Sequence, residues 1–124
     1  LLFDNDTGVY VGNAGAAGLV VEGTEAAPVS FLPWSANTPG AWAGIGVYDN
    51  VVDASMTLTN AEIGYAGGNT LKGNLHVVDA SPTLTNVLIH DGLEWGIYLS
   101  GDSVPVLTGV TYTDNEAGTC NACE

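Results

Sequence analysis

Apolar and polar residues alternate along much of this chain in short runs. This period of two predicts β-strands that bury one face, and no segment keeps an apolar stripe at the helical period. Glycine, asparagine, aspartate and proline separate the runs and mark turns. The pattern therefore predicts an all-β fold, with strands at residues 9–12, 18–24, 28–32, 44–49, 57–59, 61–65, 75–77, 83–85, 87–89, 96–99, 106–108 and 110–112.

Several of these runs lie inside a phrase that returns. Asp-Ala-Ser-Met-Thr-Leu-Thr-Asn occupies residues 53–60, and Asp-Ala-Ser-Pro-Thr-Leu-Thr-Asn follows at residues 79–86, which is 79 − 53 = 26 residues later. A weaker third copy spans residues 102–109, which is 102 − 79 = 23 residues after the second. Self-similarity at this period in a β-favouring sequence is typical of a solenoid, in which each repeat forms one coil stacked on the next.

Aligning the copies predicts columns of like residues inside the stack. Hydrogen-bonded strands lie about 4.8 Å apart, so each apolar side chain covers its counterpart in the next coil. The threonines between these positions are expected to point outward. The predicted interior columns are Leu58, Leu84 and Leu107; Ala61, Val87 and Val110; and Ile63, Ile89 and Tyr112.

One further column consists of Asn60, Asn86 and Gly109, which stand between two strands with no room for a long loop. A corner of one or two residues needs positive φ, which asparagine and glycine tolerate best. Stacked amides can also hydrogen-bond to one another along the stack. We therefore expect an inward-facing asparagine ladder at this corner.

The repeated segments resemble the right-handed parallel β-helix superfamily, and they are similar to the repeat modules of secreted and cell-surface bacterial proteins. The resemblance lies in residues 55–63, 81–89 and 96–99, with further likeness in residues 18–31 and 39–45. It is specific for architecture and says little about activity, because this fold hosts many functions.

The resemblance implies a single β-solenoid domain over residues 1–124, with about four to five coils. Residues 1–8 form a lead-in segment, residues 9–115 form the coils, and residues 116–124 form a C-terminal tail.

Charge narrows the range of partners. Fourteen acidic residues stand against one basic residue, Lys72, and the formal net charge is −13. Phosphate contacts require lysine and arginine, so the composition argues against nucleic acid, anionic membranes and polyanionic glycans. It favours cations as partners instead. No apolar run reaches the roughly 18 residues that a membrane span needs, so we expect no membrane insertion.

Asp53, Asp79 and Asp102 open the three copies and form a column of carboxylates. Stacked carboxylates repel one another unless they splay into water or share a cation, and flexible oxygen ligands suit Ca²⁺. Aspartate also favours the ends of short strands as an ordinary turn residue. The column is therefore the candidate metal site, with Ca²⁺ as the one candidate cofactor, and the turn interpretation stands beside it.

Cys120 and Cys123 lie close to the C-terminus. A disulfide that closes this small loop would fit an oxidising compartment, and a bridge to a neighbouring chain or segment is the alternative. A redox-active pair would normally open a helix in a βαβ unit, which the pattern lacks.

The sequence holds no convincing catalytic constellation. Lyases of the resembling fold use an arginine or lysine base, but this chain has no arginine, and no acids clearly converge on Lys72. Aspartates on adjacent coils acquire the spacing of paired carboxylates automatically, which makes them poor evidence for a glycosidase. His76 and His90 are expected to be surface or turn residues, with His90, Asp91 and Asp114 as a weaker metal patch. We therefore expect no enzyme.

Aromatic residues offer an alternative based on binding. An outward strip of rings can stack on sugars, although in a small solenoid aromatic residues also cap ends or seal loops. The strip would consist of Tyr48, Tyr65, Trp95 and Tyr98. Trp34 and Trp42 lie in a loop rich in proline and glycine at residues 33–43, and we expect them to fold over a coil face or an end.

A stack of coils exposes open strand edges at both ends, and such edges recruit other strands unless they are covered. The sequence shows no amphipathic capping helix, and Leu1 in place of methionine suggests a processed, secreted chain or a piece of a longer one. We expect an extracellular or cell-surface structural or adhesive solenoid that stacks on itself into a filament, or on flanking solenoid segments. The alternative is a carbohydrate-binding or carbohydrate-active module with a neutral glycan as its partner.

Overall fold

Short β-strands make up the fold. The computed structural model describes residues 1–123, and these form twelve strands and no helix. The all-β prediction is confirmed, and this part of the chain has no helix with the length and apolar character needed to cross a bilayer. The strands are β1 (Leu2–Phe3), β2 (Gly8–Val11), β3 (Ala17–Glu22), β4 (Val29–Pro33), β5 (Gly44–Val47), β6 (Val51–Gly64), β7 (Gly73–Val78), β8 (Thr83–His90), β9 (Trp95–Ser100), β10 (Val106–Thr108), β11 (Thr111–Thr113) and β12 (Gly118–Cys120).

The strands form two sheets in which every pairing is parallel. One sheet has seven strands (β1, β3, β4, β6, β8, β10 and β11) and the other has five, in the order β12-β9-β7-β5-β2. Between one strand and its neighbour in the same sheet, the chain visits the other sheet. Parallel strands require such crossovers. The arrangement is compatible with a β-solenoid.

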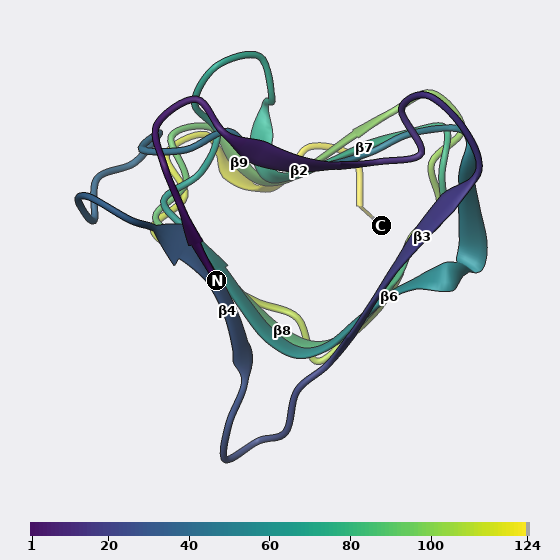
Figure 1. Ribbon diagram of the computed structural model, residues 1–124, viewed down its shortest axis with the longest axis horizontal. Coiled ribbons are helices and arrows are strands. Elements are labelled where there is room, and N and C mark those ends of the chain that lie inside the picture. The colour runs from purple at the N-terminus through teal and green to yellow at the C-terminus, as the bar shows by residue number, and fades with distance from the viewer. Residues whose placement is uncertain (124) are drawn as a thin grey trace.

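Successive segments of the chain follow one triangular outline (Figure 1). β2, β7 and β9 lie along one side, β3 and β6 along the second, and β4 and β8 along the third. β6 and β8 each contribute to two sides, because β6 pairs with both β3 and β4, and β8 pairs with both β10 and β11. The apolar side chains of these strands fill the centre of the outline.

The leucine column predicted from the repeats is confirmed. Leu58 is in register with Leu84, and Leu84 is in register with Leu107. Leu58 and Leu84 are fully buried, whereas Leu107 is half-buried because β10 is an edge strand. The other pairs in register are Ala61 with Val87, Ile63 with Ile89, and Ile89 with Tyr112, while Val110 lies between β10 and β11.

The corner at Asn60, Asn86 and Gly109 has the predicted backbone but not the predicted side-chain direction. The φ angles are 50°, 53° and 64°, in the left-handed region. Asn86 is exposed and Asn60 is only half-buried, so the inward-facing ladder was a wrong prediction. A residue at the apex of a bend carries its side chain on the convex side. The Asn60 amide donates instead to the Gly23 carbonyl of the neighbouring coil, at 3.1 Å.

The amides that do face inward belong to Asn74 and Asn115. Asn74 is 0% exposed, and its Oδ1 accepts from the backbone N–H of Ala66 at 2.8 Å. Its Nδ2 donates to the His90 carbonyl at 3.1 Å and to Asn115 Oδ1 at 2.8 Å. Asn115 donates onward to the carbonyl of Ile89 at 3.1 Å. These two amides satisfy backbone groups at a corner where strands end, as buried polar groups require.

The two tryptophans of the β4–β5 loop lie in opposite environments. Trp42 is fully buried; its ring stacks on Phe3 with centroids 4.3 Å apart, and its Nε1 donates to the Gly64 carbonyl at 2.8 Å. Trp42 therefore fills the interior beneath Phe3, and the expectation that it covers an outer face is corrected. A buried indole N–H needs a partner, and the Gly64 carbonyl supplies it. Trp34 is 69% exposed.

Candidate functional site

The aspartate column bonds to the backbone of neighbouring coils. Asp53 Oδ1 accepts from the N–H of Ser81 at 2.8 Å, and Asp79 Oδ1 accepts from the N–H of Asp102 at 2.8 Å. All three aspartates are exposed. Within residues 1–123, no three or more His, Cys, Asp or Glu side chains are grouped to hold a metal ion. The bonds fit the turn interpretation, in which each carboxylate ties one coil to the next.

Cys120 and Cys123 form a disulfide with their Cα atoms 5.6 Å apart. Both half-buried residues pack against the interior at the C-terminal end of the stack. The geometry corresponds to the first of the three interpretations of these cysteines, a small loop closed within one chain.

His90 lies at the end of β8 between two carboxylates. Its Nε2 is 2.8 Å from Glu62 Oε1 on β6, and its Nδ1 is 2.7 Å from Asp91 Oδ2. Glu62 Oε2 accepts from the hydroxyl of Ser30 on β4, at 2.8 Å. The imidazole lies over Gly64, where a β-carbon would come within 2.5 Å of the ring. The network spans three neighbouring coils, because β4 pairs with β6 and β6 with β8.

Sequence reasoning found only part of this network. His90 and Asp91 were noted as a weak metal patch, but Glu62 and Ser30 were missed. The repeat alignment held the necessary signal, because it sets Gly64 opposite His90 and leaves room for the large ring.

The network does not have the geometry of nucleophilic catalysis. An ionised carboxylate only accepts hydrogen bonds, so His90 must donate from both ring nitrogens and is then an imidazolium. It has no lone pair left to take a proton from a nucleophile. The Ser30 hydroxyl donates to Glu62 rather than to the imidazole. The arrangement ties coils together and holds charge in place.

The predicted aromatic strip divides between two places. Tyr65 meets the His90 ring edge-on, with centroids 5.2 Å apart, and Trp95 lies against Gly118. Tyr48 and Tyr98, in contrast, belong to the outer face of the five-stranded sheet. Tyr10 and His76, which the sequence did not select for the strip, lie on the same face. The register along this face runs from Tyr10 to Gly46, His76 and Tyr98.

The rings on this outer face contact one another in pairs. Tyr10 and Tyr48 have centroids 6.5 Å apart and planes 23° apart. His76 and Tyr98 meet edge-on at 4.9 Å. Lys72, the only basic side chain of the protein apart from histidine, places Nζ 5.5 Å from the centre of the Tyr98 ring. At that distance the ammonium is attracted to the ring face.

Burial and neighbouring charges affect the titration of this surface. Burial raises the pKa of Tyr48, and the nearby Tyr10 raises it further. Burial lowers the pKa of His76, and the positive charge of Lys72 lowers it further. The backbone N–H of Lys72 donates to His76 Nδ1 at 3.1 Å, which requires an unprotonated nitrogen there. His76 is thus held in its neutral form.

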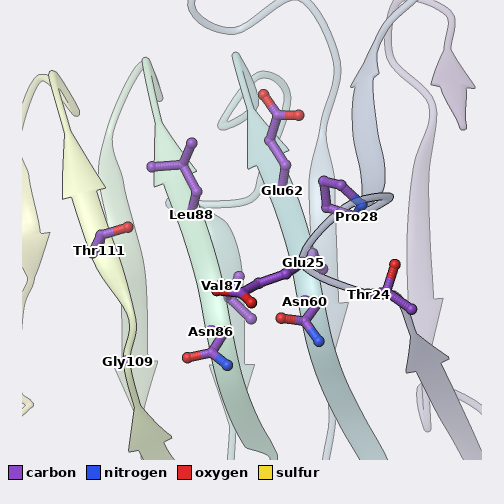
Figure 2. A pocket seen from close by; sticks show the side chains of 11 residues that line it. Thr24, Glu25, Pro28, Asn60, Glu62, Asn86, Val87, Leu88, Gly109 and Thr111 are labelled. Carbon is purple, nitrogen blue, oxygen red and sulfur yellow. The ribbon is translucent and has the colours of Figure 1, made fainter.

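A shallow hollow of about 370 Å³ lies at the asparagine corner. Figure 2 shows the amides of Asn60 and Asn86 on neighbouring strands, with Glu25 of the β3–β4 loop beside them. Glu25 and Glu62 are the carboxylates of its lining, which includes no aromatic residue. Because Glu62 is already bonded to His90 and Ser30, the hollow does not present two free carboxylates to a substrate.

No protein-family model, curated protein or solved structure matches this chain. Its function is therefore argued from the geometry above.

Proposed function

We propose that this chain is a right-handed parallel β-helix of four to five coils, as roughly expected from its repeats, and that it serves as a structural or adhesive module. Its coils stack on further coils, either those of a second copy in a filament or those of flanking segments in a longer surface protein. The parallel pairing of all strands and their alternation between two sheets support this architecture.

One interior column carries the proposal. Val9, Ile45, Leu75, Ile97 and Cys120 occupy successive positions across the five-stranded sheet. The three middle residues are fully buried, whereas Val9 and Cys120 at the two ends are only half-buried. Burial in this column therefore depends on a covering coil on both sides. Each end offers apolar surface that one more coil would bury.

The strand edges point the same way. β1, β2 and β3 are outermost at one end, and β10, β11 and β12 at the other. No helix covers either end in the described part of the chain. Unpaired edges of this kind recruit strands. Beside β10, a hollow of about 420 Å³ is lined by Leu99, Val104, Leu107 and Cys123 among others, which leaves this end incompletely packed.

The two ends are complementary because every internal coil already joins its neighbour in the same way. In a head-to-tail stack, β12 of one copy pairs with β2 of the next, and Cys120 lies over Val9. Such a contact uses different surfaces on the two partners and does not close, so it generates a filament.

The location that fits this role is outside the cell. The disulfide between Cys120 and Cys123 is of the kind that persists in oxidising compartments. The net charge of −13 keeps the sides of a filament apart while its ends associate. A divalent cation on the exposed aspartates would lower this repulsion and assist stacking.

The test is the dependence of particle mass on protein concentration. Light scattering and negative-stain images of the purified chain should show mass rising with concentration and unbranched filaments. Val106→Lys places a charge on the edge strand β10, where Val106 is 56% exposed. This variant should stay small, because a lysine on an edge opposes strand addition.

Val52→Lys is the matched control, since Val52 is 48% exposed but lies on the central strand β6. It should associate like the unmodified chain. A chain that stays monomeric at every concentration would contradict the proposal, as would equal effects of the two variants. Loss of association in EDTA would assign a role to divalent cations, and unchanged association would remove that role.

A further inference from the structure

The outer face of the five-stranded sheet carries an aromatic column that runs along the stack. Tyr10, Gly46, His76 and Tyr98 occupy the same position on four successive strands. The Tyr48 ring fills the place that Gly46 leaves vacant, since a β-carbon on Gly46 would lie 2.9 Å from that ring. Each of four successive coils thus contributes one ring, at strand spacings of about 4.8 Å.

This surface is accessible yet not part of the interior. Tyr10 is 42% exposed, and Tyr48, His76 and Tyr98 are each half-buried. The rings lean on one another and on the sheet, so little side-chain entropy remains to be lost on binding. Tyrosine combines an apolar ring with a polar hydroxyl, which suits ligands that carry both kinds of surface.

Charge restricts what this column can bind. Lys72 is the only lysine or arginine of the chain, and the net charge is −13. A polyanion would be repelled by the molecule as a whole. A free cation has no carboxylate here to bind, because the column consists of phenol and imidazole rings with His76 neutral. A neutral ligand with flat apolar faces and hydroxyl edges remains.

We propose that the column Tyr10, Tyr48, His76 and Tyr98 binds a neutral linear polysaccharide lying along the stack. The sugar rings stack on the tyrosine rings, and their hydroxyls exchange hydrogen bonds with the tyrosine hydroxyls and with the N–H of His76. Because the four rings follow one line, a longer oligosaccharide engages more of them, and affinity rises with chain length. This binding lies on the side of the stack and is independent of the end contacts.

Affinity electrophoresis and calorimetry with neutral hexaoses of glucose, in β-1,4, β-1,3 and α-1,4 linkage, and with a xylan hexaose test this proposal. At least one should bind more tightly than its trimer, and polygalacturonate should not bind. Tyr98→Ala and Tyr10→Ala should each weaken binding about tenfold, which corresponds to about 1.4 kcal/mol. Tyr98→Phe should retain most of the affinity, because it keeps the ring.

Trp34→Ala is the matched control, because Trp34 is an exposed aromatic residue in the β4–β5 loop, away from this column. It should bind like the unmodified chain, and thermal unfolding should confirm that all four variants fold. Failure of every neutral probe to bind overturns the proposal, as does an equal loss in Trp34→Ala. If Tyr10→Ala and Tyr98→Ala change particle mass without any glycan binding, the face is a contact between copies. That result leaves the end-stacking test with Val106→Lys untouched.

Discussion

At the scale of single residues, His76 and His90 lie on outer positions of β7 and β8 but have opposite neighbours. His76 lies beside Lys72 and accepts a hydrogen bond from the Lys72 backbone. His90 lies between Glu62 and Asp91 and donates toward both. One imidazole is therefore built to stay neutral, and the other is built to hold charge between two acids.

The neutral state of His76 predicts a dependence of stability on pH. Because its pKa in the folded chain is lowered from 6.5, the unfolded chain binds more protons than the folded one as pH falls below 6.5. Protonation at His76 then favours unfolding. The free energy of unfolding of the unmodified chain should fall, relative to that of His76→Gln, between about pH 7.5 and about pH 5.

Denaturant titrations at several pH values measure this difference. The carboxylates and His90 contribute equally to both proteins and cancel in the comparison. Parallel curves for the two proteins over this range would contradict the assignment of a neutral His76.

At the scale of strands and corners, the amide of Asn74 joins three coils. It accepts from Ala66 after β6, and it donates to His90 at the end of β8 and to Asn115 before β12. Asn74→Ala should leave these buried groups without partners and lower the free energy of unfolding by about 3 kcal/mol. Chemical denaturation measures the loss.

Asn37→Ala serves as the control, since Asn37 is an exposed loop residue. It should change stability by less than about 0.5 kcal/mol. A similar small effect for Asn74→Ala would show that solvent replaces the lost partners and that the corner is open to water.

The strands inside the repeats could be predicted because the repeat itself fixes the register. A shift of 26 residues places Leu58 over Leu84 without knowledge of the turns. Asn74 and Asn115 are 41 residues apart and meet across corners of unequal length, so no repeat alignment pairs them. Asn86 was assigned inward because amides can stack, but the sequence does not reveal on which side of a bend a corner residue points.

The candidate binding column shows the same limit. Tyr48 and Tyr98 could be selected as aromatic residues on outer positions. Tyr10 and His76 could not, because the loop of residues 34–43 separates β4 from β5 and breaks the spacing between the first coils and the repeats. The fold followed from periodicity, whereas this surface depended on register across an irregular loop.

At the scale of the whole molecule, charge and apolar ends act against each other. Each copy carries a net charge of −13, and its acidic residues lie on exposed or half-buried positions along the sides. The interior columns at both ends lack a covering coil. Stacking buries these columns but brings two strongly acidic bodies together, so the medium decides the balance.

Association should therefore strengthen as salt is added. Screening shortens the range of repulsion from about 10 Å at 0.1 M to about 3 Å at 1 M, while the burial of apolar surface is kept. The concentration at which half of the chains are associated should fall about tenfold over this range, which corresponds to about 1.4 kcal/mol. Light scattering in sodium chloride measures this midpoint. Val106→Lys should remain small throughout, and weaker association at high salt would mean that ion pairs, rather than the apolar ends, hold the copies together.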